Sequence, residues 1–291
     1  MQPVDQILTP AALRHWPLPI PDGDKTSRGR VLVIGGARTA PGAVMLAGLA
    51  ALRVGAGVLT LAVAESVAGP VAAAVPESAV LWLPQTPTGS VAGSAAESIR
   101  SALDTAAAIL IGPGLDDVDE TAELIAGLVP DAPEHLPIVL DAYAIGAIGQ
   151  LSAATLEALA GRLLLTPNHN ELERLLAASD EPADSDDPQH LLAERYQAVL
   201  SSDNRIVAPS GDSWLAPAGH SGLGTSGSGD VLAGALVGLL ARGASLTQAT
   251  CWATYLHAAA GDRLAARVGS LGFLARELLD ELPLVLTELQ A

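Results

Sequence analysis

Residues 222–230, which read Gly-Leu-Gly-Thr-Ser-Gly-Ser-Gly-Asp, combine residue types that bind anions and move protons. Four of these nine residues are glycine, so the backbone can turn tightly and approach a ligand closely. Uncharged residues follow from 231 to 241 and predict a buried helix whose free N–H groups would face the stretch. Asp230 would repel a phosphate at that helix start, unless its carboxylate accepts a proton from an attacking group. The stretch therefore predicts an anion hole with a general base at its rim.

Other interpretations of this stretch fit less well. Gly222, Gly224 and Gly227 have the spacing of a dinucleotide-binding fingerprint, but that fingerprint needs an acidic residue about 20 positions later, after a second strand. The chain is predicted to be helical there, and its nearest acid, Asp262, falls on a helix. A nucleophile elbow is excluded because residues 224–228 lack the second glycine of that motif. An aspartate that only caps a helix remains the alternative.

Three further segments follow predicted strands, at the sheet edge where ligands bind in α/β folds. They are the Gly-Pro-Gly segment 112–114, Asp141, and segment 166–171, in which Asn168 or Asn170 would begin a helix. Tight turns and helix caps explain the same residues, so a structural role and a functional role both stay open. The six histidines have no metal-ligand spacing, and no side-chain metal site is predicted.

The charge of the chain limits its partners. With 32 acidic and 15 basic residues, the chain has a net charge of −17, which argues against nucleic acid and anionic membranes as partners. Lys25 is the only lysine, so any anionic ligand must be bound by backbone N–H groups, helix starts, a metal ion or a few arginines. A Walker loop, a Schiff base and a protein-kinase ion pair are therefore excluded. A small molecule is the expected partner.

The chain has one cysteine, Cys251, which excludes a disulfide framework and a cysteine-based zinc site. We interpret this residue as a small buried apolar side chain on a helix rather than a nucleophile. The N-terminus lacks a basic segment followed by an apolar one, and no apolar run reaches the roughly 18 residues that a membrane span needs. A soluble, cytoplasmic protein is expected.

Short apolar runs alternate with helical patterns from residue 30 onward. The predicted strands are 31–34, 58–63, 79–83, 107–111, 138–140 and 163–165. Nearly continuous apolar strands that alternate with helices indicate an α/β fold, with a mostly parallel sheet covered on both faces. Residues 1–291 are interpreted as one domain, in which residues 1–25 form an N-terminal arm with a short helix near 10–15.

The second half of the chain gives further expectations. Residues 205–208 and 212–215 predict a hairpin around a Pro-Ser-Gly turn. The acidic residues of segment 180–187 are interpreted as a solvated loop, with metal binding as the alternative. The chain is predicted to end in three helices, at 230–242, 246–268 and 272–289.

Taken in order, these motifs resemble the ribokinase-like superfamily and, within it, the ADP-dependent NAD(P)H-hydrate dehydratases. The resemblance spans Lys25 to about Leu286 and depends on the order and spacing of many short motifs. They are Gly29-Arg-Val-Leu-Val-Ile-Gly-Gly36, Pro41-Gly-Ala43, Arg53-Val-Gly-Ala-Gly57, Pro76-Glu77, Ile111-Gly-Pro-Gly-Leu115, Val139-Leu-Asp-Ala142, Leu165-Thr-Pro167 with Glu171, Gly227-Ser-Gly-Asp-Val-Leu232, and Tyr255-Leu-His257 with Ala260-Gly-Asp262. The fold implied is a three-layer α/β/α sandwich.

The resemblance implies repair of hydrated NADH or NADPH. A phosphoryl group passes from ADP or ATP to the C6 hydroxyl of the hydrate, phosphate is eliminated, and Mg²⁺ bridges the nucleotide phosphates. Asp230 would be the base, and the N–H groups around Gly227, Ser228 and Gly229 would stabilise the transferring phosphoryl group. Family members often assemble as homotetramers. By the same resemblance, the residues that would face the nicotinamide substrate are Ala43, Gly114, Asn168 and Asp230.

The nucleotide site implied by the resemblance comprises Gly229 and the hairpin turn. That turn reads Pro209, Ser210, Gly211, Asp212 and Ser213, where the family usually has Lys-Gly-x-x-Thr. Two other positions also depart from the family pattern. Asn168 replaces the usual histidine, and Tyr143 replaces the usual second aspartate after Asp141. Two alternatives therefore stay open, a related kinase of a vitamin-precursor alcohol and a nucleotide-binding homologue without catalysis.

Overall fold

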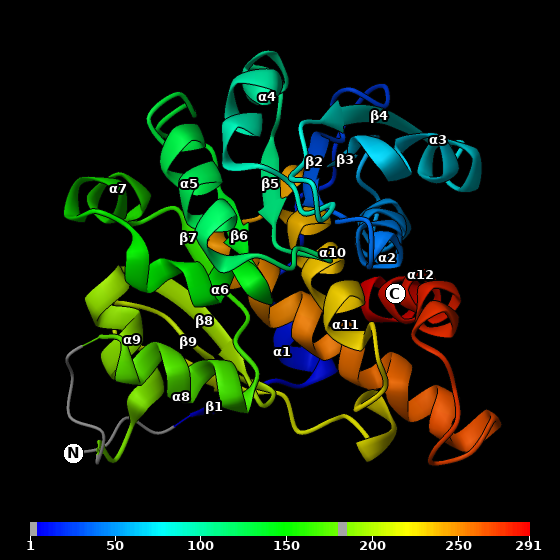
Figure 1. The fold of residues 1–291 in the computed structure, drawn as a ribbon. Helices are drawn as coiled ribbons and strands as arrows, with labels where there is room; N and C mark the ends of the chain where they lie inside the picture. The colour runs from blue at the N-terminus through cyan, green and yellow to red at the C-terminus, as the bar shows by residue number, and fades with distance from the viewer. Residues whose placement is uncertain (1–4, 180–184) are drawn as a thin grey trace.

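The computed structural model describes residues 5–179 and 185–291, and these form one ten-stranded sheet flanked by helices (Figure 1). The strand order is β1-β10-β9-β8-β7-β6-β5-β2-β3-β4, and all neighbours are parallel except at β9, which is antiparallel to β8 and to β10. The strands are β1 (Gln6–Ile7), β2 (Arg30–Gly35), β3 (Val58–Ala64), β4 (Ser78–Leu83), β5 (Ala108–Ile111), β6 (Ile138–Leu140), β7 (Leu163–Leu165), β8 (Ala198–Ser202), β9 (Arg205–Val207) and β10 (Ser213–Leu215).

Two groups of helices cover the sheet (Figure 1). On one face α2, α10, α11 and α12 pack against one another, while α4, α5, α6, α8 and α9 form a connected series on the other. The α-helices are α1 (Pro10–Arg14), α2 (Pro41–Arg53), α3 (Glu65–Ala74), α4 (Ala96–Leu103), α5 (Val118–Leu128), α6 (Tyr143–Ala147), α7 (Ala153–Leu159), α8 (His169–Ala177), α9 (Pro188–Tyr196), α10 (Ser228–Ala241), α11 (Leu246–Arg267) and α12 (Ala275–Gln290). Among the described residues, none of these helices has the length and apolar character to cross a membrane.

The predicted fold class is confirmed, and each of the six predicted parallel strands is present with ends that move by at most one residue. The predicted hairpin is β9 and β10, and the predicted C-terminal helices are α10, α11 and α12. Two strands are absent from the prediction. β8 ends in Ser201 and Ser202, so its apolar run is short, although both serines are buried. β1 has only two residues, both exposed, and its pairing with β10 makes the N-terminal arm part of the sheet.

The order in which successive strands are added to the sheet reverses at β2. The chain runs from β2 outward through β3 to β4, then returns to β5 on the other side of β2 and continues through β6 and β7. In open α/β sheets, ligands bind beyond the carboxyl ends of the strands at such a reversal. The loops after β2 and β5 are therefore the part of the fold where a ligand is expected.

Helix α10 is the central element behind this edge. Apart from Arg242 at its C-cap, its residues from Val231 onward are uncharged and almost all buried, because the helix packs against α2, α11 and β5. Gly234 lets α10 and α2 approach closely, since a Cβ atom there would lie 2.1 Å from the carbonyl oxygen of Ala47. Helix α10 is thus held rigidly by backbone contact, and its first turn faces the ligand edge.

Two residues that the sequence singled out have structural roles. Cys251 is fully buried on α11, and burial raises the pKa of its thiol well above the ordinary value, as expected for an apolar role. The prediction that 180–187 is a solvated loop is wrong at Asp187, which caps α9 and pairs with Arg205. Residues 180–184 of that segment lie outside the described residues.

Candidate active site

The loops after β2 and β5 bind each other through their backbones. The N–H of Gly36 donates to the carbonyl of Pro113 over 2.8 Å, and the N–H of Ala37 donates to that of Gly114 over 2.8 Å. Gly114 has φ +70, and a Cβ atom there would lie 2.2 Å from the carbonyl oxygen of Ala40 and 3.2 Å from the Cβ atom of Ala43. The glycine is therefore required for both its backbone angle and its close contact. The structure brings Ala43 and Gly114, two predicted substrate residues, side by side.

The glycine-rich loop ends where α10 begins. Gly227 is the N-cap residue with φ +88, and a Cβ atom on it would lie 2.6 Å from a side-chain carbon of Leu46 on α2. The backbone N–H groups of Gly229 and Asp230 have no hydrogen-bond partner within the described ranges. A Cβ atom on Gly229 would meet nothing within 4 Å. The first turn of α10 thus presents free donors to open space, which is the geometry of an anion hole.

Ser228 and His257 form a buried pair behind this turn. The Ser228 hydroxyl lies 2.9 Å from Nε2 of His257 on α11, and both residues are buried. Burial lowers the pKa of His257 to about 4, so the imidazole is neutral at pH 7. The pair anchors the first turn of α10 to α11. The sequence prediction included Ser228 but missed this role of His257, because 29 positions separate the two residues.

Two carboxylates lie at the ligand edge. Asp230, in the first turn of α10, is half-buried, and burial raises its pKa to about 6. Asp141 follows β6 and is buried, and its carboxylate accepts a hydrogen bond from the Thr166 hydroxyl over 2.5 Å. Burial raises the pKa of Asp141 to about 7, and the negative charges of Asp230 and Glu171 add to this rise. Carboxyl groups with pKa values in this range are suited to proton transfer near neutral pH.

Asn168 has a clear structural role. Its side-chain oxygen accepts from the N–H of Glu171 over 3.0 Å, and the Glu171 carboxylate accepts from the N–H of Asn168 over 2.9 Å. This reciprocal pair is a capping box that begins α8. The side-chain oxygen of Asn168 is therefore occupied, and only its amide donors remain for a substrate. The predicted substrate-facing role of Asn168 stays a prediction.

The hairpin turn between β9 and β10 is built by its own backbone. The N–H of Ala208 donates to the carbonyl of Asp212 over 2.9 Å, and the N–H of Gly211 donates to that of Ala208 over 3.0 Å. The Ser210 hydroxyl donates to the Asp212 carboxylate over 2.8 Å. Residues 210–212 are exposed, whereas the side chain of Ser213 is buried. A ligand therefore meets Ser210, Gly211 and Asp212 rather than the side chain of Ser213.

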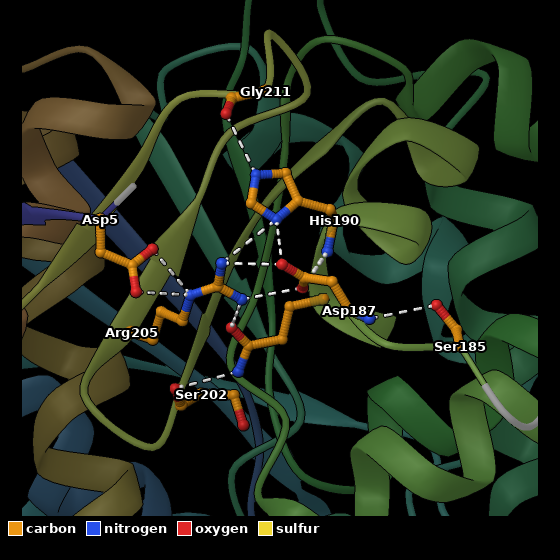
Figure 2. A network of polar contacts seen from close by, with 8 residues as sticks. Asp5, Ser185, Asp187, His190, Ser202, Arg205 and Gly211 are labelled. Carbon is orange, nitrogen blue, oxygen red and sulfur yellow. Dashed lines mark hydrogen bonds and ion pairs between the residues drawn. The ribbon is translucent and has the colours of Figure 1, made fainter. Parts of the chain in front are cut away.

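A network of charged and polar side chains contacts this turn through His190 (Figure 2). Arg205 binds the carboxylates of Asp5 and Asp187, with its Nε 3.0 Å from Asp5 and its two terminal nitrogens 2.8 and 2.9 Å from Asp187. Hydrogen bonds from Arg205 and His190 help to hold the pKa of Asp187 at about 2, so this carboxylate is ionised at neutral pH. His190 contacts Asp187 through Nδ1 and the carbonyl of Gly211 through Nε2, over 2.8 and 3.1 Å. The positive charge of Arg205 is paired with two carboxylates. Arg205 therefore does not supply the free cation that the lysine of the family hairpin would supply.

Replacing His190 with alanine removes its contact with the carbonyl of Gly211 in the hairpin turn, so we expect the turn to open more often. Loss of the bond should lower the free energy of unfolding by about 1 kcal/mol. Amide hydrogen exchange at residues 208–212 should become faster. His169→Ala is the control, because His169 is mostly exposed on α8. Equal exchange in the two variants would contradict this role of His190.

Side chains alone do not form a metal site here. Within residues 5–179 and 185–291, no three His, Cys, Asp or Glu side chains are grouped so that they could hold a metal ion. Mg²⁺ commonly uses one or two carboxylates together with nucleotide phosphates and water. Asp141 and Asp230 supply carboxylates at the same edge, so the donor set fits a metal ion that enters with a nucleotide.

The mostly parallel sheet, with its reversal at β2 and helices on both faces, is the arrangement of a ribokinase-like α/β protein. A ribokinase-like superfamily protein from Enterococcus faecalis V583 has this fold, with a TM-score of 0.82 and 23% identity over 98% of this chain and 97% of that chain. The chain belongs to the NAD(P)H-hydrate dehydratase family, whose model matches residues 31–284. This family membership confirms the resemblance drawn from the short motifs.

Dehydratases of this family are similar over nearly the whole chain. An ADP-dependent (S)-NAD(P)H-hydrate dehydratase from Xanthomonas campestris pv. campestris is 40% identical in an alignment of 289 positions that covers 97% of this chain and 96% of the relative. The crystal structure of an ADP/ATP-dependent NAD(P)H-hydrate dehydratase from Bacillus subtilis, co-crystallized with ATP/Mg²⁺, has a TM-score of 0.76 at 27% identity and covers 97% of each chain. Several other relatives are bifunctional NAD(P)H-hydrate repair enzymes, and this chain spans about half of their length.

Proposed function

We propose that this protein dehydrates hydrated NADH and NADPH in a reaction driven by ADP or ATP. The observation that carries the proposal is the first turn of α10, which combines free N–H donors with the carboxylate of Asp230, whose pKa is raised to about 6 by burial. That turn packs against α2, which carries Ala43, and Ala43 in turn lies beside Gly114. Family membership and the Xanthomonas relative support the same substrate class.

The chemistry has two steps in this proposal. Asp230 accepts the proton of the C6 hydroxyl, and the hydroxyl oxygen forms a bond to the terminal phosphorus of the nucleotide, which releases AMP or ADP. The N–H groups of Gly229 and Asp230 stabilise the charge on the transferring phosphoryl group. The C6–O bond then breaks, inorganic phosphate leaves, and loss of a proton from C5 restores the ring double bond. The net products are NADH or NADPH, phosphate and the shortened nucleotide.

The nucleotide would lie between Gly229 and the hairpin turn of Ser210, Gly211 and Asp212. Mg²⁺ supplies charge neutralisation on the phosphates when bound, and the Bacillus subtilis neighbour was co-crystallized with ATP/Mg²⁺. Because the turn has an acid and no lysine, nucleotide binding relies on backbone donors and the metal ion. The Asp212 carboxylate accepts a hydrogen bond from the Ser210 hydroxyl, which holds this side chain within the turn.

The pH dependence of the reaction follows from the raised pKa values. A base acts only when ionised, and burial raises the pKa of Asp230 to about 6 and that of Asp141 to about 7. We expect kcat/KM to rise with pH and to level off above a midpoint between about 6 and 7. A profile of kcat/KM from pH 4 to 9 at saturating ADP measures this. A rate that is already maximal at pH 5 would contradict a base in this environment.

The direct test is turnover. The protein is incubated with hydrated NADH or NADPH, Mg²⁺ and either ADP or ATP, and the return of reduced-nicotinamide absorbance is followed. We expect nucleotide-dependent recovery, and comparison of ADP with ATP identifies the phosphoryl donor. Accumulation of a stable phosphorylated product without recovery would instead identify a kinase. Thermal stabilisation by ADP or NADPH without turnover would identify a binding protein. A single-domain organisation, homotetrameric assembly and a cytoplasmic location stay predictions.

A further inference from the structure

A pocket of about 290 Å³ lies between α6, α8 and the start of α5. Its walls are mostly apolar and include Val118, Ile145 and Leu175. The side chains that give the pocket polar character are those of Tyr143, Glu171 and Arg174. Neither proton transfer at Asp230 nor the nucleotide hairpin uses this pocket.

The pocket adjoins the candidate active site at two points. Ala142 lines the pocket and directly follows Asp141, whose pKa is raised in part by Asp230. Glu171 also lines the pocket, and its carboxylate accepts from the backbone N–H of Asn168 over 2.9 Å. The pocket is therefore joined to the candidate active site through the pairs Asp141–Ala142 and Asn168–Glu171.

The backbone between the two regions is strained. Ala142 has φ 48 and ψ −121, a conformation that non-glycine residues rarely adopt. On one side of this turn, Asp141 is buried at the ligand edge. On the other side, Tyr143 begins α6 with 47% of its surface exposed and lines the pocket. The turn thus directs consecutive residues to the active site and to the pocket.

Arg174 provides a cation at the pocket. Glu171, Arg174, Leu175 and Ala178 are spaced by three, four and seven positions, so they share the face of α8 that lines the pocket. The Arg174 side chain is exposed and makes no ion pair or side-chain hydrogen bond within the described residues. Glu171 is engaged in the capping box instead. An available guanidinium, an exposed aromatic ring and apolar walls form a set that recognises a nucleotide.

We propose that this pocket binds the adenosine half of the hydrated dinucleotide, with the adenine against Tyr143 and a phosphate group paired with Arg174. The inference rests on the proposed function, which places the nicotinamide half at Asp230. A dinucleotide carries its adenine at the end opposite to the reacting ring, so an enzyme that holds both halves needs a second subsite beside the first. Tyr143, which replaces the usual family aspartate, supplies the aromatic surface of that subsite.

Binding of unreactive NADPH and NADH tests the proposal without turnover. The protein is saturated with ADP, so that the nucleotide site is filled, and the Kd of each reduced dinucleotide is measured by its fluorescence. We expect Tyr143→Ala to raise both Kd values about tenfold, as loss of base stacking does, and Tyr143→Phe to leave them unchanged. Arg174→Gln should raise the Kd of NADPH about tenfold. Arg100→Gln is the matched control, because Arg100 lies on α4 and pairs with Asp131.

The effect of Arg174→Gln on the Kd of each dinucleotide identifies which phosphate group Arg174 contacts. If Arg174→Gln weakens NADPH alone, Arg174 pairs with the 2′-phosphate; if it weakens both dinucleotides equally, Arg174 pairs with the pyrophosphate. Ala178→Phe, which fills the pocket from its exposed rim, should weaken both. Wild-type affinity in all three pocket variants, with unchanged melting temperatures, would overturn the proposal, as would failure of the wild type to bind either dinucleotide. Turnover that persists alongside such a result would leave the proposed function intact, so the two failures are distinguishable.

Discussion

Replacing Asp230 with asparagine should lower kcat for hydrate dehydration about 1,000-fold, the range associated with loss of a positioned general base. Asparagine has the shape of aspartate but cannot accept the proton of the C6 hydroxyl. The backbone donors of the first turn of α10 are kept, so nucleotide affinity should change little. The measurement is kcat with saturating nucleotide and hydrate at pH 8, where the wild-type carboxylate is ionised.

The free energy of unfolding of Asp230→Asn distinguishes loss of the general base from misfolding of the variant. Because the folded protein raises the pKa of Asp230 from 3.8 to about 6, the folded state binds more protons than the unfolded state between these values. The free energy of unfolding therefore falls as pH rises through this window, and Asp230→Asn should be at least as stable as the wild type at pH 8. Asp280→Asn, at an exposed position of α12, is the control for a change of charge. An Asp230→Asn variant that keeps more than a tenth of wild-type kcat would contradict the assignment of the base.

Replacing Gly234 with alanine should lower the free energy of unfolding by about 3 kcal/mol, the upper end of the range for overpacking a core. The added Cβ atom would lie 2.1 Å from the carbonyl oxygen of Ala47, which is backbone and cannot rotate away. Helices α2 and α10 must then separate. Because α2 carries Ala43 and α10 carries Asp230, kcat should fall as well. Urea unfolding and the dehydration assay measure the two effects.

Gly229→Ala is the matched control on the same helix. A Cβ atom on Gly229 meets nothing within 4 Å, so stability should be unchanged or slightly higher, as alanine favours a helix over glycine. The added methyl group would instead occupy the open space in front of the helix start, and the KM for the nucleotide should rise. Equal stability losses in Gly229→Ala and Gly234→Ala would contradict the contrast between a ligand-facing glycine and a packing glycine.

The fold was largely predictable because its signals are local. Buried parallel strands are short apolar runs, and α10 is recognisable from a long uncharged run behind a glycine-rich loop. The missed strands have weaker signals. β8 ends in two serines whose burial depends on neighbouring elements, and β1 is a two-residue strand that exists only because β10 lies beside it.

The candidate site was only partly predictable, because its physical properties arise from contacts between distant segments. The glycines and the acid of 227–230 indicate the anion hole, yet no sequence pattern reveals the burial that raises the pKa of Asp230. The His257 support and the Arg205 network join residues that are far apart in the chain. Nor does sequence indicate that Tyr143 lies in the same pocket as Arg174.

The most direct test of the proposed reaction follows one oxygen atom. Hydrated NADPH with ¹⁸O in its C6 hydroxyl is turned over with ADP and Mg²⁺ in unlabelled water, and the inorganic phosphate is examined by mass spectrometry. Attack by the hydroxyl deprotonated by Asp230 predicts one ¹⁸O atom in the phosphate for each NADPH formed. Recovery of the ¹⁸O in water, with unlabelled phosphate, would contradict phosphoryl transfer to the C6 hydroxyl.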